Sequence, residues 1–173
     1  MHTSLSFLLA EWEAWAAAAD QSDDGWQSDY PRWAELMAAA TAAMEHPDNN
    51  LDAIEKCWLL SEEDECLADH VRKNPSHYLG LLTALAKSNY PSVRWQVYAS
   101  LEGASPIGAD ILESGSADPD AYARRRAIFA LAKAKPGFVL DKIDEFCSDP
   151  DPDNRLVFTR LRDELSKTTV LLT

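Results

Sequence analysis

The chain has 173 residues and a formal net charge of −13, and its 6 glycines are few beside many alanines, leucines, glutamates and aspartates. This composition favours helices over strands, the acidic surplus disfavours nucleic-acid phosphates, and no apolar run reaches the roughly 20 residues of a membrane span. Three cysteines suit a reducing compartment better than a disulfide framework. We therefore expect an all-α, cytoplasmic protein that binds neither nucleic acid nor a membrane.

Hydrophobic spacing and turn residues predict about ten helices. The segments expected to be helical, in chain order, are 4–19, 30–46, 50–60, 62–73, 75–87, 91–101, 107–113, 119–134, 137–146 and 153–166. The fourth helix is expected to start after Ser61, because Asp64 three positions later completes a capping-box-like pattern. Residues 168–173 are too short to pack on their own.

The negative charge is concentrated in the first half of the chain. Residues 1–89 contain 16 acidic and 5 basic residues, a net charge of −11, whereas residues 90–173 contain 13 and 11, a net charge of −2. A field of this sign favours encounter with a basic partner. The first half is therefore the expected binding half.

A short pattern occurs twice, thirty residues apart, in residues 92–101 and 122–131. Each copy follows a turn that contains proline and carries an arginine early in the helix, then small or apolar residues at helical spacing. A weaker third copy contains Arg155. Repetition at this period is typical of a solenoid, in which each helical pair buries its apolar face on its neighbours. The residues expected inside are Val97, Leu101, Ala127, Leu131 and Phe158.

These turns, followed by helices with arginine and then alanine and leucine at fixed offsets, resemble HEAT repeats over residues 75–166. The resemblance implies a short, right-handed α-solenoid of antiparallel helical pairs. It also implies structural roles for Arg94, Arg124 and Arg155, which would bridge neighbouring repeats through the turn residues Asp118, Asp120 and 149–153. We assign residues 1–173 to a single domain: 1–74 divergent N-terminal helices, 75–166 HEAT-like pairs and 167–173 a tail.

Two acidic segments are the candidate binding surface. Asp23, Asp24 and Asp29 surround Trp26, which is either an exposed hot spot for a partner or a staple folded back over the first two helices. The run Glu62, Glu63, Asp64 and Glu65 would point around the circumference of a helix and lacks the spacing of a calcium loop, so it is a solvated turn or a surface for basic groups.

Catalytic and metal-binding patterns are missing from the sequence. Cys66 and His70 lie four residues apart, half of a zinc site, but no second pair has ligand spacing. There is also no phosphate-binding glycine loop, nucleophile elbow or metalloprotease helix. We expect no enzyme activity, no metal and no cofactor.

An alternative site lies in the second half of the chain. Arg124 belongs to the repeat pattern, whereas Arg125 and Arg126 are expected to face solvent or a concave groove. HEAT-like alkylpurine DNA glycosylases have a basic concave surface, so an adaptor or enzyme that binds a nucleic acid or small molecule there is the second interpretation. The net charge of the chain disfavours it.

Small, acidic, cytosolic helical proteins without catalytic motifs resemble immunity proteins that neutralise a co-produced toxin. A carboxylate-rich surface can occupy the basic cleft of a nuclease in place of phosphates. The sequence therefore predicts a monomeric protein-binding module whose partner is a basic protein such as a toxin nuclease.

Overall fold

The structure, a computed structural model, describes residues 4–19, 21–22, 26–104 and 106–170. These residues form eleven α-helices and two short 3-10 helices, and none of them lies in a strand. The predicted all-α class and the expected number of about ten helices are confirmed. The chain divides into two compact units, Met1–Ser100 and Leu101–Thr173. Among the described helices, none has the length and hydrophobicity that crossing a membrane requires.

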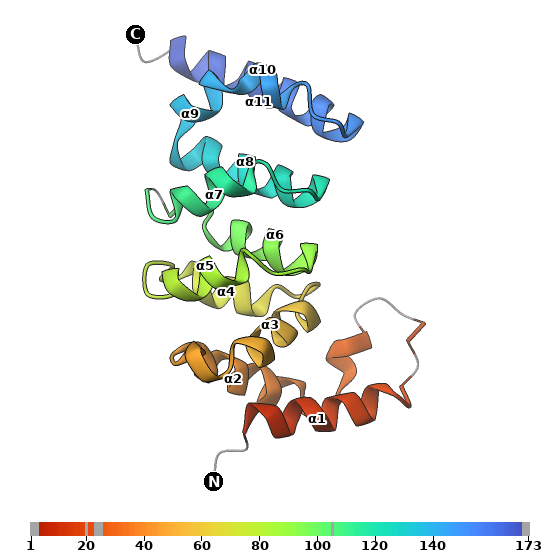
Figure 1. The fold of residues 1–173 in the computed structure, drawn as a ribbon. Coiled ribbons are helices and arrows are strands. Elements are labelled where there is room, and N and C mark those ends of the chain that lie inside the picture. The colour runs from red at the N-terminus through yellow and green to blue at the C-terminus, as the bar shows by residue number, and fades with distance from the viewer. Residues whose placement is uncertain (1–3, 20, 23–25, 105, 171–173) are drawn as a thin grey trace. The chain divides into compact units, whose positions relative to one another are not determined.

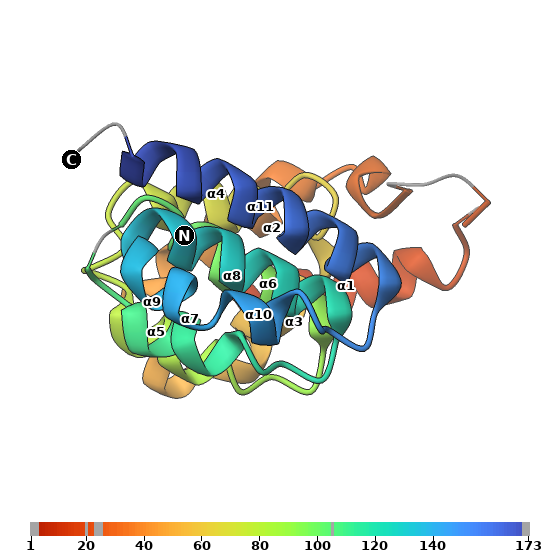
Figure 2. The same cartoon turned by 90° about the horizontal axis from the view of Figure 1, so that it is seen from above.

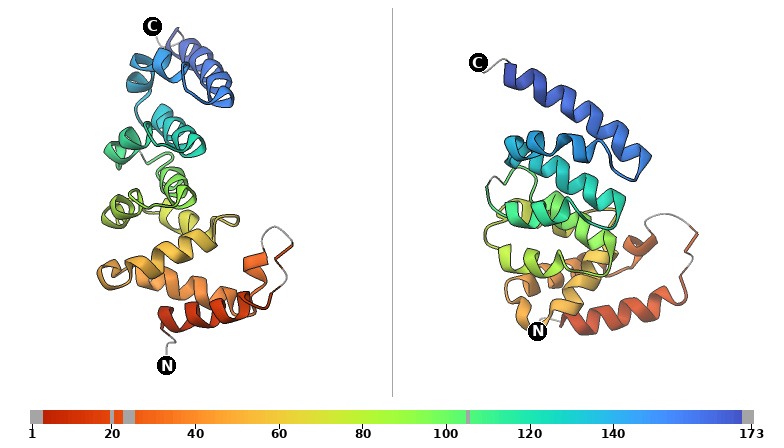
Figure 3. Two further views of the ribbon diagram at one scale, coloured as in Figure 1. Left: turned by 45° about the vertical axis from the view of Figure 1, so that its right-hand side comes forward. Right: turned by 45° about the horizontal axis from the view of Figure 1, so that its top comes forward.

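The first unit contains six α-helices and both 3-10 helices. They are α1 (Leu5–Ala16), η1 (Trp26–Asp29), α2 (Trp33–Met44), η2 (Pro47–Asn49), α3 (Leu51–Leu60), α4 (Cys66–Arg72), α5 (Leu79–Leu85) and α6 (Pro91–Ser100) (Figure 1). Helix α2 contacts α1, α3 and α4, and helix α6 contacts α3, α4 and α5. The 3-10 helix η1 lies beside α1, with the ring of Trp26 stacked on that of Trp12 (Figure 3).

The core of this unit is built on the inward faces of these helices. Its fully buried side chains include Leu8, Leu36, Ile54, Trp58, Leu67, Leu82 and Val97. Each large apolar side chain removed from water stabilises the fold by about 1.5–3 kcal/mol. The core also contains a buried polar link: Gln96 Nε2 donates to the carbonyl of Trp58 over 2.9 Å. This hydrogen bond connects α6 to α3.

The second unit contains five α-helices: α7 (Ala109–Gly115), α8 (Ala121–Ala134), α9 (Pro136–Asp141), α10 (Ile143–Phe146) and α11 (Pro152–Val170). Helix α8 packs on α7 and α9, while α11, the long C-terminal helix in Figure 2, packs on α9 and α10. Phe158 is fully buried, with its ring 6.1 Å from Phe146 and 6.5 Å from Phe129. All five side chains predicted to lie inside are buried.

Several helix boundaries differ from the predicted ones. Helix α11 continues to Val170, so the first residues of the predicted tail are helical. The segment 137–146 forms two helices, because Lys142 adopts φ −109° and ψ 8°, outside the α region. The segment 75–87 starts its helix at Leu79, after a turn. The fourth helix starts at Cys66, because Glu65 has the left-handed φ of 49°. A left-handed residue cannot continue a right-handed helix, so the predicted start after Ser61 was wrong.

The repeated arginines make the same contact in all three copies of the pattern. The Nη1 atoms of Arg94, Arg124 and Arg155 each donate to the carbonyl six residues earlier, over 2.8, 2.7 and 2.9 Å. In the last two copies the aspartate at that earlier position accepts a hydrogen bond from the backbone N–H two residues on, over 2.8 Å in both. The copies therefore share one local structure: a turn with a hydrogen bond from the backbone to a side chain, linked to the following helix by hydrogen bonds from an arginine.

Arg124 also bridges two turns of the second unit. Its Nε and Nη2 atoms donate to the two carboxylate oxygens of Asp149, both over 2.8 Å. The predicted pairing of Arg124 with an aspartate of the next turn is confirmed. The stacking of the helical pairs into a right-handed solenoid, the HEAT-like identity and the single domain stay predictions.

Candidate functional site

The turn at residues 62–65 and the 3-10 helix η1 meet at one surface hollow of the first unit. The hollow has a volume of about 250 Å³ and is lined by Gln27, Ser28, Trp33, Leu60, Glu63 and Asp64. Its walls come from η1, the start of α2, the end of α3 and the turn after α3. Trp33 Nε1 donates to Asp64 Oδ2 over 3.2 Å, which fastens α2 to that turn. We call this feature the acidic hollow.

The run of acidic residues at 62–65 forms this turn. Asp64 Oδ1 accepts a hydrogen bond from the backbone N–H of Cys66 over 3.1 Å, which caps the start of α4. Glu62, Glu63 and Asp64 are exposed. A turn can present consecutive side chains on one side, whereas a helix spreads them around its circumference. The acidic residues are therefore better placed to act together than the predicted helix allowed.

We expect Glu65→Gly to raise the free energy of unfolding by about 0.5–1 kcal/mol. A side chain on a left-handed residue costs about 1–2 kcal/mol, and glycine removes this cost. The substitution also removes an exposed ion pair with Arg72 at 3.5 Å, which offsets part of the gain. Urea denaturation followed by circular dichroism measures the change. Glu65→Ala, which retains the strain, is the control, and a glycine variant no more stable than the alanine variant would contradict the expectation.

Several basic residues of the first unit pair with carboxylates away from Glu62 and Glu63. Arg32 pairs with Glu11 and with Glu35, the latter at 2.8 Å, and Lys56 pairs with Glu13. Within the described part of the chain, neither Glu62 nor Glu63 forms an ion pair. The charges of Glu62 and Glu63 are therefore not neutralised by a neighbouring side chain among the described residues.

Trp26 lies over helix α1. Its ring stacks on Trp12 at a centroid distance of 5.8 Å and on Trp15 at 5.9 Å, and its side chain is half-buried. Of the two interpretations of Trp26, this geometry matches the fold-back staple. Trp26 fixes the position of η1, whose next residues line the hollow.

The structure describes one of the three predicted partner-binding aspartates that surround Trp26 in the sequence. Asp29 is exposed at the end of η1. Asp23 and Asp24 lie outside the described residues. The structure thus brings η1 together with Glu63 and Asp64, and it adds Trp33, which is not among the predicted partner-binding residues.

The alternative groove residues lie on α8 in the second unit. Arg125 has its guanidinium carbon 5.5 Å from the ring centre of Tyr122, a cation–π contact within the helix. Arg125 and Arg126 are both half-buried.

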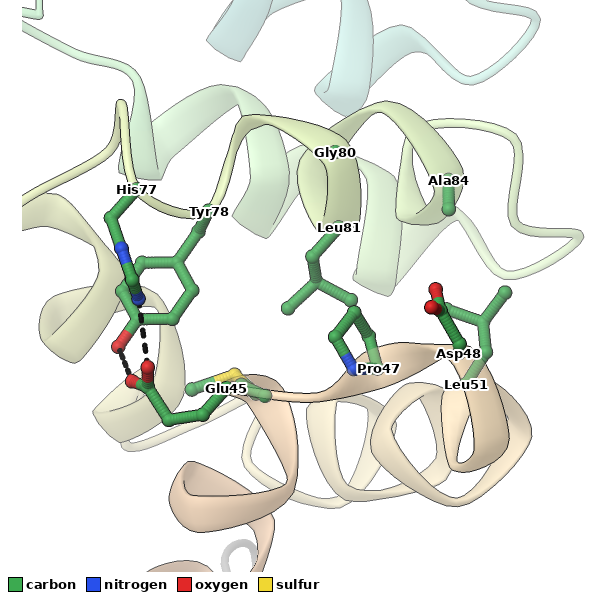
Figure 4. Close-up of a pocket in the computed structure, with 10 residues that line it drawn as sticks. Glu45, Pro47, Asp48, Leu51, His77, Tyr78, Gly80, Leu81 and Ala84 are labelled. Carbon is green, nitrogen blue, oxygen red and sulfur yellow. Dashed lines mark hydrogen bonds and ion pairs between the residues drawn. The ribbon is translucent and has the colours of Figure 1, made fainter.

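A second cleft, which the sequence did not predict, lies at the opposite end of α2. Its volume is about 460 Å³, and Figure 4 shows its walls formed by α5, the end of α2, η2 and the start of α3. Tyr78 Oη donates to Glu45 Oε1 over 2.6 Å, and His77 Nε2 lies 2.8 Å from Glu45 Oε2. Because residues 45 and 77 are far apart in the chain, no sequence pattern joins them. We call this feature the α5 cleft.

The hydrogen bonds in this cleft set the charge of its groups. The bond from Tyr78, followed by that from His77, lowers the pKa of Glu45 below its ordinary value, so Glu45 is anionic at neutral pH. Burial and then Glu45 raise the pKa of Tyr78 to about 12, which retains its proton. Since that proton goes to Glu45, His70 Nε2 is the donor in its 3.0 Å contact with the Tyr78 oxygen.

The described residues hold no group of three or more His, Cys, Asp or Glu side chains placed to bind a metal ion. Burial, followed by the charge of Asp64, raises the pKa of the Cys66 thiol to about 12. Burial likewise raises the pKa of Cys57 to about 12. Protonated thiols are poor nucleophiles and poor metal ligands.

Comparisons of the chain with protein-family models, with curated proteins and with solved structures found no match. The function is therefore argued from the residues themselves.

Proposed function

We propose that this chain is a non-catalytic protein-binding module whose acidic first unit binds a basic protein partner. The observation that carries the proposal is the meeting of η1 and the turn at residues 62–65 around the acidic hollow. The turn supplies the carboxylates Glu63 and Asp64, η1 supplies the neutral polar residues Gln27 and Ser28 from more than thirty positions earlier in the chain, and Trp33 adds an aromatic wall.

The distribution of charge between the units supports the same surface. Residues 1–100 contain 16 acidic and 6 basic residues, a net of −10, and residues 101–173 contain 13 and 10, a net of −3. The basic side chains that pair in the first unit neutralise carboxylates other than Glu62 and Glu63. Complementary charge raises the rate of encounter and disfavours acidic competitors.

A lysine or arginine of the partner fits the hollow by its chemistry. The charged group would meet Glu63 and Asp64, and its methylene stem would lie against the Trp33 ring, a favourable position for a cation. A toxin nuclease, which presents such residues to bind phosphates, is the partner class that we propose. The chain would then act as an immunity protein by occupying the substrate cleft.

The test is capture of partners from the cells that produce the protein. Immobilised wild-type protein is compared with a Glu62→Lys/Glu63→Lys variant, and bound proteins are identified by mass spectrometry. We expect a basic protein that elutes with salt and is missing from the variant. Recovery of acidic partners would contradict the proposal and move the site to α8. So would a partner that binds both proteins equally and is lost only in Arg125→Ala/Arg126→Ala.

A further inference from the structure

The α5 cleft has the dimensions of a small-molecule site. Its volume of about 460 Å³ falls within the roughly 300–1,000 Å³ that is typical of ligand pockets. Helix α2 begins at Trp33, beside the acidic hollow, and ends at Met44, which lines the α5 cleft. The two features therefore lie at opposite ends of one helix, and the cleft is separate from the proposed partner surface.

The polar groups of the cleft lie at its two ends. Figure 4 shows Glu45 at one end with His77 and Tyr78, and Asp48 at the other, while Pro47 and Leu81 lie between them. Each oxygen of Glu45 accepts one hydrogen bond and retains a further lone pair for a ligand. Asp48 is exposed and has no hydrogen bond with another described residue.

We propose that the α5 cleft binds a short aliphatic diamine, with one ammonium group at Glu45 and the other at Asp48. The methylene chain between the ammonium groups would lie against Pro47 and Leu81, which offer no hydrogen-bonding side chain. An anion would be repelled at both ends, and a monoamine would leave one carboxylate without a counter-charge. This assignment does not depend on the proposed protein partner.

The spacing of the carboxylates favours a short ligand. Glu45 and Asp48 are three positions apart in the chain, so their Cα atoms are separated by at most about 10 Å. Cadaverine, 1,5-diaminopentane, is a probe of this scale. The hydrogen bonds from Tyr78 and His77 hold the Glu45 carboxylate in place, so that part of the site is ordered before a ligand arrives.

Gly80 provides a way to fill the cleft. It is the second residue of α5 and lines the cleft, and a Cβ atom built on it meets nothing within 4 Å. Because Gly80 lines the cleft, we expect a leucine at this position to occupy part of it without displacing the backbone. Gly137 is a matched position, because it is the second residue of α9 and a Cβ there also meets nothing within 4 Å.

The proposal is tested by isothermal titration calorimetry of the whole chain with cadaverine. We expect saturable binding to the wild-type protein and to Gly137→Leu, and at least a tenfold loss of affinity in Gly80→Leu. Circular dichroism establishes that both variants are folded. Absence of saturable binding to the wild-type protein, or equal loss in the two leucine variants, would overturn the proposal.

Charge controls separate the cleft from general attraction to an acidic protein. Asp48→Asn and Glu45→Gln are each expected to weaken binding about tenfold, whereas Asp52→Asn, which removes one exposed charge outside the cleft, leaves it unchanged. n-Pentylamine and 1,5-pentanediol should bind at least tenfold more weakly than cadaverine. If all the aspartate variants weaken binding equally, or if pentylamine binds as tightly as the diamine, the two-ended site is wrong.

Discussion

Replacing Arg124 with alanine is expected to lower the free energy of unfolding by about 2–4 kcal/mol. The side chain of Arg124 is 13% exposed and that of Asp149 is 6% exposed, and two hydrogen bonds of 2.8 Å join them. Arg124 also donates to the carbonyl of Asp118 over 2.7 Å. The substitution leaves a buried carboxylate without its counter-charge and a carbonyl without its donor. Urea denaturation measured by circular dichroism gives the change.

Two variants control this measurement. Arg125→Ala, at the neighbouring position of α8, removes a half-buried arginine that contacts the ring of the exposed Tyr122. We expect this substitution to cost less than about 1 kcal/mol. Arg124→Lys retains the positive charge but loses the two-pronged geometry, so its stability should lie between those of the wild type and the alanine variant. Equal stability of Arg124→Ala and Arg125→Ala would show that the bridge contributes little.

The same pair gives the stability a dependence on pH. Burial alone would raise the pKa of Asp149, but the hydrogen bonds from Arg124 and from the backbone of Asp151 bring it below its ordinary value of 3.8. A carboxyl group whose pKa is lower in the folded protein than in the unfolded chain stabilises the folded state at pH values above its unfolded-state pKa. This contribution disappears as the pH falls through its folded-state pKa. The difference in the free energy of unfolding between the wild type and Arg124→Ala should therefore have its largest value at pH 7 and decrease below about pH 4.

Reversing Glu62 and Glu63 to lysine is expected to lower the association rate with the basic partner about 10- to 100-fold at low ionic strength. Both side chains are exposed beside the acidic hollow, so the substitution changes the local potential without removing a core contact. The dissociation rate should change less, because charges at the rim act mainly on encounter. Surface plasmon resonance with the captured partner measures both rates.

A matched reversal in the second unit tests whether position matters. Asp141→Lys/Asp144→Lys changes the net charge by the same amount at two exposed positions. We expect this variant to retain most of the association rate, and the effect of Glu62→Lys/Glu63→Lys to shrink as salt shortens the Debye length from about 10 Å at 0.1 M to about 3 Å at 1 M. Equal losses in the two variants would assign the effect to net charge rather than to the hollow.

Trp26 is a less direct probe of binding than its place in an acidic loop predicted. Because its ring stacks on Trp12 and Trp15, Trp26→Ala removes packing within the first unit together with any contact to a partner. Trp33 is the aromatic residue that lines the hollow. Its exposure there depends on the turn at residues 62–65, which the sequence pattern assigned to a helix.

The sequence by itself determined what depends on neighbouring residues. Helix formation, the proline starts at Pro91 and Pro152, and the contact of Arg94, Arg124 and Arg155 with the preceding turn all lie within a few positions of the chain. Apolar spacing along a helix also identified buried residues such as Leu131 and Phe158, because a helix has one face toward the core.

Only the tertiary structure decided which surfaces form. The acidic hollow needs η1 and the α3–α4 turn, and the α5 cleft needs Glu45 beside His77 and Tyr78. These groups are 32 to 37 positions apart, and the packing of α2 against its neighbours brings them together. The left-handed backbone of Glu65 likewise turned an expected helix into the turn that presents Glu62 and Glu63. Hydrophobic periodicity indicates which face of a helix is buried, but not which helix covers it. The acidic residues of the hollow could therefore be named from the sequence, but not the η1 and Trp33 walls beside them, and the α5 cleft could not be predicted at all.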